Sequence, residues 1–197
     1  MKKSRFAEEQ ITFVLRPAVP DDAEAVAACV DAAYRHYIER IGKPPGPMLE
    51  DYAEVIRRHQ VAVAEIDGAI VGVLVLAVTE EGLCLENVAV DPRFHGKGVG
   101  RALLERAEAE ARRQGFAAIY LYTHEKMTEN QALYAKIGYV EYDRRVEKGY
   151  SRVYMRKRLA LSPGKCLPQD RRLWDTYNIY IIAACGSSTI LQRPRQI

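Results

Sequence analysis

The chain has 197 residues, of which 48% are hydrophobic and 28% charged, and its net charge is +3. This composition is typical of a globular protein with one core domain, and so small a net charge gives no argument for a nucleic-acid partner. The longest apolar runs are far shorter than the roughly 20 residues that a membrane-spanning helix needs, so no membrane association is expected.

Residues 1–11 are expected to form an N-terminal arm. Their basic residues are not followed by an apolar segment, which argues against a secretory signal. The four cysteines include no Cys-x-x-Cys pair and no zinc-like spacing, so no metal site is predicted. Cys29 and Cys84 stand in apolar surroundings and are interpreted as core residues. Together these features favour a cytoplasmic protein.

The first part of the domain is predicted to be a short strand followed by two helices. A strand over 12–15 should be broken by the segment 16–20, which contains two prolines. The acidic pair at 21–22 begins an amphipathic helix that ends at Gly42. The Pro-rich segment 43–47 cannot be helical, and a second short helix covers roughly 49–58.

The middle of the chain is predicted to form three strands, at 61–66, 69–78 and 83–90. Asp67 and Gly68 form a typical two-residue hairpin turn, and Gly72 marks a candidate bulge. Beyond them the pattern predicts a helix over 100–114, a strand over 118–123, a helix over 130–137, and strands over 139–145 and 150–157.

The element order βααβββαβαββ contains one βαβ crossover, formed by the strand at 83–90, the next helix and the strand at 118–123. Such a unit implies a parallel pair, whereas the hairpins are antiparallel. The predicted fold is α/β of the α+β type: a mixed, mostly antiparallel sheet of six to seven strands with helices on both faces. The domain should span 12–158. Residues 159–197 form a C-terminal extension to which no role is assigned.

The most informative motif is the glycine-rich stretch from Arg93 to Gly100. It lies between the strand at 83–90 and the helix at 100–114. A glycine-rich turn at a helix N-terminus exposes backbone N–H groups at the positive end of the helix dipole, and both features favour phosphate. This turn is therefore predicted to bind a phosphorylated ligand.

Two nucleotide-binding motifs fit this turn poorly. A P-loop needs Ser or Thr after its lysine, but Lys97 is followed by Gly98. A dinucleotide fingerprint needs Gly-x-Gly-x-x-Gly, whereas the spacing here is Gly-x-Gly-x-Gly. Glu125 does follow the next strand, as that fingerprint requires. However, antiparallel hairpins precede the motif where a doubly wound sheet would have further βαβ units.

The chain resembles the GNAT superfamily of acyl-CoA-dependent N-acetyltransferases. The family signature Arg/Gln-x-x-Gly-x-Gly/Ala is matched by Arg93, Gly96 and Gly98. A second block is matched by Asn130, Ala132, Leu133, Tyr134, Gly138 and Tyr139. The likeness covers about 12–158 and implies transfer of an acetyl group from acetyl-CoA to a primary amine, on a small molecule or a peptide. A non-catalytic acyl-CoA-binding module is the alternative. A homodimer is left open.

The resemblance implies a set of cofactor-binding residues. The backbone of the turn should hold the pyrophosphate, with charge support from Arg93, Lys97 and Arg101, and the strand before it should offer backbone groups to the pantetheine arm. The full set is Val88, Ala89, Val90, Arg93, Phe94, His95, Gly96, Lys97, Gly98, Val99, Gly100, Arg101 and Asn130. The alternative for any of these glycines is that it serves only a tight turn, and for the charged residues that they are solvated surface.

The resemblance also implies catalytic roles. Tyr134 lies four residues after Asn130, on the same helix face, and would protonate the departing thiolate, since a phenol is normally protonated at neutral pH. Glu86 would act as general base or contact the acceptor, with His124 a weaker candidate. Leu133 and Ile137 are expected to make the adjoining core contact. Tyr34, Tyr37 and Tyr52 either wall the amine pocket or are structural. The acceptor itself is not identified.

Overall fold

The computed structural model describes residues 12–160. The chain divides into two compact units, Met1–Pro163 and Gly164–Ile197, and the second lies outside the described residues. The predicted N-terminal arm and all but two residues of the predicted extension also lie outside them. Among residues 12–160, no helix is both long and apolar enough to cross a bilayer.

The first unit is built on a seven-stranded sheet with the order β1-β2-β3-β4-β5-β7-β6. Its strands are β1 (Val14–Pro17), β2 (Gln60–Ile66), β3 (Ala69–Thr79), β4 (Gly82–Val90), β5 (Ala118–His124), β6 (Val140–Glu147) and β7 (Tyr150–Arg158). Every neighbouring pair is antiparallel except β4 and β5, which are parallel. The predicted mixed, mostly antiparallel sheet with one βαβ crossover is confirmed.

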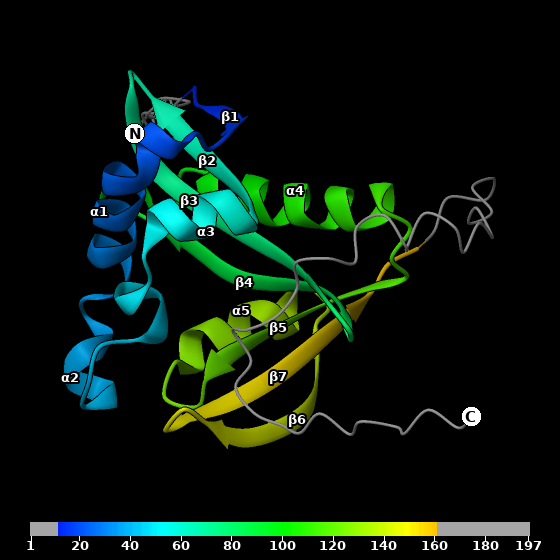
Figure 1. Ribbon diagram of the computed structural model, residues 1–197. Coiled ribbons are helices and arrows are strands. Elements are labelled where there is room, and N and C mark those ends of the chain that lie inside the picture. Colours follow the sequence, from blue (N-terminus) through cyan, green and yellow to red (C-terminus); the bar gives the residue numbers. More distant parts are fainter. Residues whose placement is uncertain (1–11, 161–197) are drawn as a thin grey trace, which may run out of the picture. The chain divides into compact units, whose positions relative to one another are not determined.

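Helices cover both faces of the sheet (Figure 1). They are α1 (Ala23–Tyr34), α2 (Tyr37–Ile41), α3 (Tyr52–Arg58), α4 (Val99–Arg113) and α5 (Thr128–Lys136), with short 3-10 turns η1 (Pro20–Asp22), η2 (Gly46–Leu49) and η3 (Pro92–Phe94). Helices α1 and α3 pack on β2–β4 from one side, and α4 packs on the same strands from the other. Helix α2 lies beyond the end of α1.

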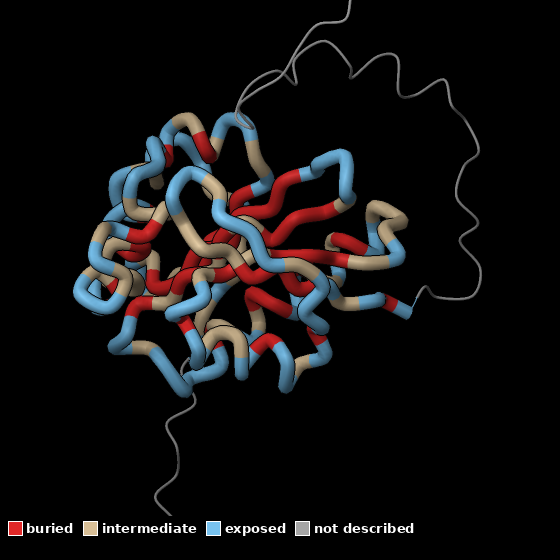
Figure 2. Tube along the Cα trace, turned by 90° about the horizontal axis from the view of Figure 1, so that it is seen from below, coloured by how far each residue is buried: buried red, intermediate tan, exposed pale blue. Residues whose placement is uncertain are grey.

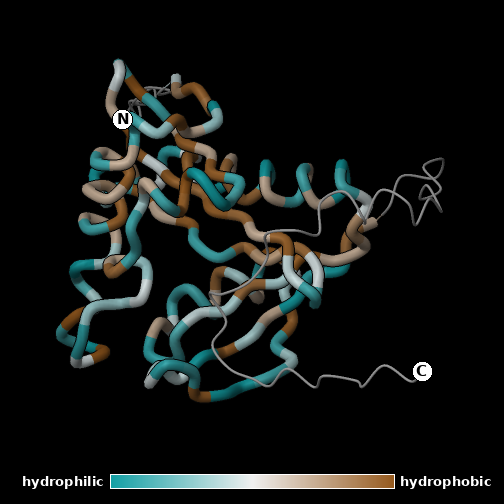
Figure 3. The backbone as a smooth tube through the Cα atoms, in the orientation of Figure 1, coloured by the Kyte–Doolittle hydropathy of each residue, from teal (hydrophilic) through white to brown (hydrophobic). Residues whose placement is uncertain are grey.

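The core forms where apolar strands meet these helices. Buried residues concentrate in the central strands (Figure 2), and the outward turns of α4 are hydrophilic (Figure 3). Gly72 of β3 is required by this packing: a Cβ there would lie 2.8 Å from Val99 and 3.0 Å from Leu103. The absence of a side chain lets α4 approach β3 closely. Cys29 and Cys84 are both buried, as expected of core residues.

Several predicted boundaries need correction in the first half of the chain. Strand β1 includes Arg16 and Pro17. It lies at the edge of the sheet, where a proline is tolerated although it has no N–H to donate to a neighbouring strand. The single helix predicted up to Gly42 is two helices, since a tighter bond from the Ile38 amide to the Arg35 carbonyl interrupts it. The Pro-rich segment is partly helical, because Gly46 and Pro47 begin η2.

Two smaller corrections concern β3 and α5. The bulge in β3 falls beside Gly72, since Ala64 pairs with Gly72 and Glu65 with Ile70, so Val71 is the extra residue. In α5, Leu133 is 47% exposed and belongs to the solvent face, so it makes no core contact. Ile137, in contrast, packs against the core as predicted.

The parallel strands β4 and β5 separate along their length. They pair only where Leu83–Leu85 lies beside Ile119–Leu121, although β4 continues to Val90 and β5 to His124. Both strands run in the same direction, so they diverge toward their carboxyl ends. The resulting splay leaves one edge of β4 without a strand partner over its last residues.

Candidate active site

The glycine-rich turn opens helix α4 with an exposed backbone. Gly96 and Gly98 have positive φ values of 75° and 86°, a region that L side chains rarely adopt. Gly98 is the N-cap of α4, no side chain caps the helix, and its first turn contains no acidic residue. Within residues 12–160, no hydrogen bond engages the amides of Gly96, Lys97 or Gly98. The turn therefore presents free N–H groups at a helix N-terminus, as phosphate binding requires.

Three other groups of the predicted phosphate site already form hydrogen bonds within the protein. The amides of Phe94 and His95 donate within η3, to the carbonyls of Asp91 and Pro92 at 2.8 and 3.2 Å. The Arg93 guanidinium donates to the buried Asp91 carboxylate at 2.7 Å. This contact is the main reason why the pKa of Asp91 is lowered. In this structure Arg93 therefore holds the turn onto the end of β4.

The two remaining cations of the turn are exposed. Arg101 forms an i, i+4 pair with Glu105 on the surface of α4. The Lys97 ammonium lies 5.0 Å from the centre of the Phe94 ring. The free amides of Gly96–Gly98 are consequently the part of the predicted site that is most clearly built for an anion.

Residues Val88, Ala89 and Val90 form the end of β4 that pairs with β3 but not with β5. Val88 and Val90 pack partly into the core on the α4 side, whereas Ala89 belongs to the cluster under α1 and α3. His95 Nε2 lies 3.0 Å from the Val90 carbonyl, in position to donate to it. On the β5 side this stretch has no strand partner, so its backbone can bind an extended ligand as an added strand would.

Tyr134 lies at the splay, on the buried face of α5. Its side chain is 7% exposed, and no hydrogen bond within the described residues uses its hydroxyl. Burial raises the pKa of Tyr134 above its ordinary value, so the phenol stays protonated at neutral pH. The pKa of Tyr34 is raised as well, mainly by burial and next by the neighbouring Tyr134. The Tyr34 hydroxyl lies 3.4 Å from the Val88 carbonyl of β4. Tyr134 thus lies near the unpaired end of β4.

Asn130 lies one helical turn before Tyr134 and is held from two sides. The Tyr37 hydroxyl donates to its Oδ1 at 3.4 Å, and its amide lies 3.7 Å from the Met127 sulfur. Tyr37 is buried and belongs to α2, so helix α2 reaches the start of α5. Burial, followed by the charge of Glu129, raises the pKa of Tyr37 to about 12.

Glu86 occupies a β-bulge in β4. Val75 pairs with Asn87 and Leu76 with Leu85, so Glu86 is the extra residue. Its Oε2 lies 3.8 Å from Nδ1 of His59, the residue that ends α3. Burial is the main reason why the pKa of Glu86 is raised; Glu50 raises it further, while His59, Arg152 and Lys148 oppose the shift. A carboxylate with a raised pKa is a better proton acceptor.

A buried hydrogen-bond network fixes this bulge, and sequence reasoning did not identify it. Asn87 is 5% exposed; its Oδ1 accepts from Tyr34 at 2.8 Å, and its Nδ2 donates to the Tyr52 hydroxyl at 3.0 Å. Tyr52 in turn donates to the Pro47 carbonyl at 2.9 Å. Tyr34 and Tyr52 therefore use their hydroxyls to tie α1 and α3 to β4. The available signal was a lone amide side chain in a strand whose only other polar side chain is that of Glu86.

Arg152 and Tyr122 lie near Glu86, whereas His124 is bound in the turn after β5. His124 Nδ1 accepts the Lys126 amide at 3.1 Å, and burial lowers its pKa. The Arg152 guanidinium stacks 4.0 Å above the Tyr122 ring and donates to Glu147 at 2.8 Å. Arg152 and Tyr122 are a second pair that the sequence did not indicate, because their strands meet only in the folded sheet. Within residues 12–160, no cluster of three or more His, Cys, Asp or Glu is arranged to hold a metal ion.

A family model described as the acetyltransferase (GNAT) family matches residues 24–139. The chain is 37% identical over 81 residues to IAA acetyltransferase of Azospirillum brasilense, covering 40% of this chain and 53% of that protein. It is 32% identical over 75 residues to [ribosomal protein bS18]-alanine N-acetyltransferase of Escherichia coli K12, covering 38% of this chain and 51% of that protein. The matched segment thus spans about half the length of each relative.

Solved structures share the fold over nearly their whole length. The ribosomal-protein-S18-alanine N-acetyltransferase from Escherichia coli superposes with a TM-score of 0.63 at 20% identity, covering 79% of this chain and 99% of that one. The PaiA N-acetyltransferase from Thermoplasma acidophilum, solved in complex with coenzyme A, gives 0.64 at 18% identity, covering 75% and 99%. At these identities the likeness establishes the fold alone.

Proposed function

Since this chain belongs to the GNAT acetyltransferase family, we propose that it transfers an acetyl group from acetyl-CoA to a primary amine. The observation that carries this proposal is the continuity of the glycine turn with the splay. Free amides at Gly96–Gly98 follow the end of β4, whose edge on the β5 side is unpaired and lies near Tyr34, a neighbour of Tyr134. One extended thioester ligand with a pyrophosphate fits this arrangement.

The donor half of the site fits coenzyme A in charge and shape. Uncapped N–H groups at the start of α4 suit a pyrophosphate. The unpaired edge at Val88–Val90 suits the amide-containing pantetheine arm, which pairs with such an edge as a strand does. Asn130, held by Tyr37, lies at the start of α5 beside that route. Acetyl-CoA supplies an acetyl group activated as a thioester.

The acceptor half uses Glu86 and Tyr134. Glu86 takes a proton from the incoming ammonium, directly or through one water, and so frees the nitrogen lone pair. The nitrogen then bonds to the thioester carbon and the carbon–sulfur bond breaks. Tyr134 gives its proton to the departing sulfur, and the second proton lost by the nitrogen restores the phenol. The raised pKa values of Glu86 and Tyr134 suit the two roles.

A non-catalytic acyl-CoA-binding module is the alternative. It would need the glycine turn and the edge of β4 but would have no use for a tyrosine hydroxyl that can give a proton to the departing sulfur. The Tyr134 hydroxyl therefore favours the transferase. Amine-dependent release of free thiol separates the two functions, because a binding module would bind acetyl-CoA without turnover.

Isothermal titration calorimetry with acetyl-CoA tests the donor half by itself. We expect saturable binding by the wild-type protein, weakened by salt because charge attraction contributes to pyrophosphate binding. ATP and NAD serve as matched phosphate-containing ligands that lack the pantetheine arm, and they should bind much more weakly. No detectable heat with acetyl-CoA would contradict the proposal.

A further inference from the structure

One segment of the chain spans the wide end of the splay between β4 and β5. We define the strap as residues 37–45, comprising α2 and the segment Gly42–Pro45 that follows it. It leaves α1, which packs on β3 and β4, and reaches α5 and the β6–β7 hairpin. These lie on the β5 side of the splay, since β5 pairs with β7.

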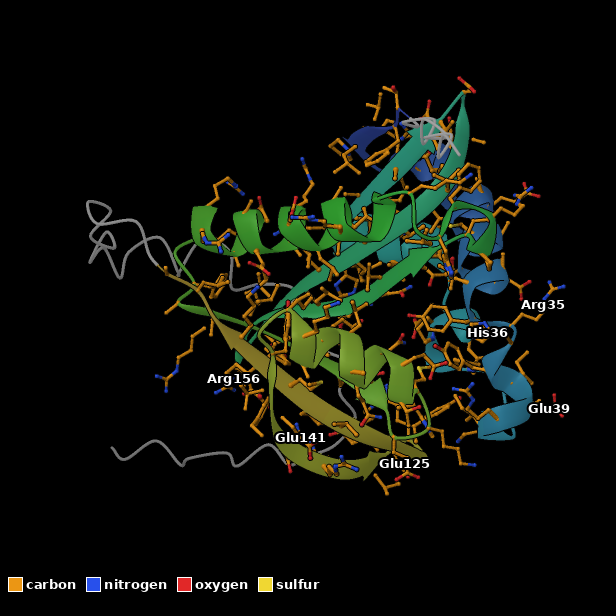
Figure 4. All side chains as sticks on the ribbon, turned by 180° about the vertical axis from the view of Figure 1, so that it is seen from behind. Arg35, His36, Glu39, Glu125, Glu141 and Arg156 are labelled. Atoms are coloured by element: carbon orange, nitrogen blue, oxygen red, sulfur yellow. The ribbon has the colours of Figure 1, made fainter. Side chains whose placement is uncertain are left out.

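The first set of strap contacts joins α2 to the start of α5. Arg40 donates to both carboxylate oxygens of Glu129, at 2.8 and 2.7 Å, and to the Lys126 carbonyl at 3.2 Å. One turn earlier, Tyr37 donates to Asn130. Tyr37 and Arg40 share a helix face, whereas Glu39 projects outward from α2 (Figure 4). Helix α2 thus directs one face toward α5 and another toward solvent.

The second set joins the strap to the turn of the β6–β7 hairpin. Lys43 donates to the Gly149 carbonyl at 2.7 Å, and its ammonium lies 3.7 Å from the centre of the Tyr150 ring. The Tyr150 hydroxyl donates to the Pro44 carbonyl at 2.7 Å. Strap and hairpin touch directly, and the two segments are 106 residues apart in sequence. These contacts link the two sides of the splay at this end.

The same region borders the space in front of Glu86. The charged groups that act on Glu86 come from the end of α3 (His59), from the segment after η2 (Glu50), and from β7 and its hairpin turn (Arg152 and Lys148). The Glu86 side chain is only 32% exposed. An amine reaching it must therefore pass between groups of α3, of the segment after η2 and of the β6–β7 hairpin.

Given the transferase function proposed above, we infer that the strap restricts the acceptor to a small free amine and excludes amines at the end of a polypeptide. A peptide acceptor needs an open groove for the residues that follow its terminus. Here the strap and the hairpin close the end of the splay where such a groove would run. A small amine needs only the space in front of Glu86.

The test compares matched acceptors that differ only in size. Thiol release from acetyl-CoA is measured with a panel of amino-acid amides and with hexapeptides that begin with the same residues. The wild-type protein should use at least one small amide and should use its hexapeptide counterpart at least about tenfold less well in kcat/KM. Equal use of both members of each pair would overturn the inference.

The second part of the experiment uses a variant with a loosened strap. The Lys43→Ala/Tyr150→Phe double variant removes the hairpin contacts from residues that do not belong to the core, and Arg35→Ala is the matched control. The Arg35 side chain pairs with Asp31 on α1 and, within residues 12–160, forms no hydrogen bond with α5 or the hairpin. Loss of two hydrogen bonds should raise hexapeptide use about tenfold. The Arg35→Ala variant should not change it, and acetyl-CoA affinity should be unchanged in the double variant.

Hydrogen exchange of the strap amides shows whether the double variant has loosened the strap. Faster exchange without any gain in hexapeptide use would contradict the inference while leaving the transferase intact. Absence of thiol release with every amine, despite acetyl-CoA binding, would instead contradict the transferase and this inference together.

Discussion

The Tyr34 hydroxyl donates a 2.8 Å hydrogen bond to Oδ1 of the buried Asn87. This contact joins α1 to β4 beside the bulge that carries Glu86. The same amide donates to Tyr52 of α3. Both helices on this face of the sheet are therefore fastened to the residue that follows the proposed general base, so the position of Glu86 depends on hydrogen bonds made by two other elements.

Tyr34→Phe is expected to leave Oδ1 of Asn87 without its donor. Because Asn87 is buried, the loss should lower the free energy of unfolding by about 1–3 kcal/mol, measured by urea denaturation. It should also lower kcat, since the bulge becomes less well fixed. Tyr142→Phe is the matched control: its hydroxyl bonds Glu81 on the exposed surface, and its removal should change neither quantity. Equal effects of the two variants would refute the role assigned to Asn87.

Glu86→Gln is expected to slow turnover and to alter its pH dependence. The ionised carboxylate accepts the proton, so kcat/KM of the wild type should fall as the pH drops through the pKa of Glu86. That pKa lies above its ordinary value of 4.5. The glutamine variant should lack this acid limb. Glu50→Gln retains the base but removes a charge that raises its pKa, so its acid limb should move to lower pH. An unchanged profile in Glu86→Gln would remove Glu86 as the base.

Tyr134→Phe is expected to keep acetyl-CoA affinity and to lower kcat about a hundredfold or more, since it removes the proton donor to the thiolate. Calorimetry and thiol release measure the two effects. Tyr139→Phe is the matched control, because the two rings are neighbours, with centroids 5.7 Å apart. It should leave kcat unchanged. Similar losses in both variants would indicate that Tyr134 serves packing instead of proton transfer.

Tyr139→Phe should also change stability. The Tyr139 hydroxyl is buried and has no hydrogen-bond partner among the described residues. Burying an unsatisfied hydroxyl costs free energy, so its removal should raise the free energy of unfolding by about 1 kcal/mol. Thermal unfolding measures this difference directly. A less stable variant would mean that the hydroxyl has a partner in solution.

Gly98→Ala is expected to damage both stability and acetyl-CoA binding. The alanine has open space around it, but its φ of 86° is left-handed and costs about 1–2 kcal/mol. Any relaxation of that strain turns the free amides of the loop, so the acetyl-CoA Kd should rise about tenfold. Gly46→Ala is the control: its Cβ also meets open space, but its φ is not left-handed. It should be nearly neutral in both measurements.

The features that sequence could predict are local ones. The apolar runs and the glycine turn at 96–98 specify a strand, a turn and a helix within one continuous stretch, so the βαβ crossover and the exposed amides follow without knowledge of distant contacts. The i, i+4 spacing of Asn130 and Tyr134 also predicts their shared helix face correctly. Leu133 was assigned to the wrong face, because spacing within a short helix does not say which side meets the core.

The acceptor side depends on contacts that spacing cannot reveal. Asn87 meets Tyr34 across 53 residues and Tyr52 across 35, and the strap meets the hairpin across 106. Likewise, Arg93 fits the phosphate motif in sequence, yet its guanidinium binds Asp91 in the folded chain. Such pairings arise when separate elements pack together, so only the structure distinguishes a residue that contacts ligand from one that holds another residue.

The most direct test of the proposed function is amine-dependent release of free thiol from acetyl-CoA by the purified wild-type protein. We expect thiol release that requires both protein and a primary amine, that saturates with amine, and that is lost in Tyr134→Phe but kept in Tyr139→Phe. Thiol release that is the same with and without every amine in the panel, in a protein that binds acetyl-CoA, would contradict the account.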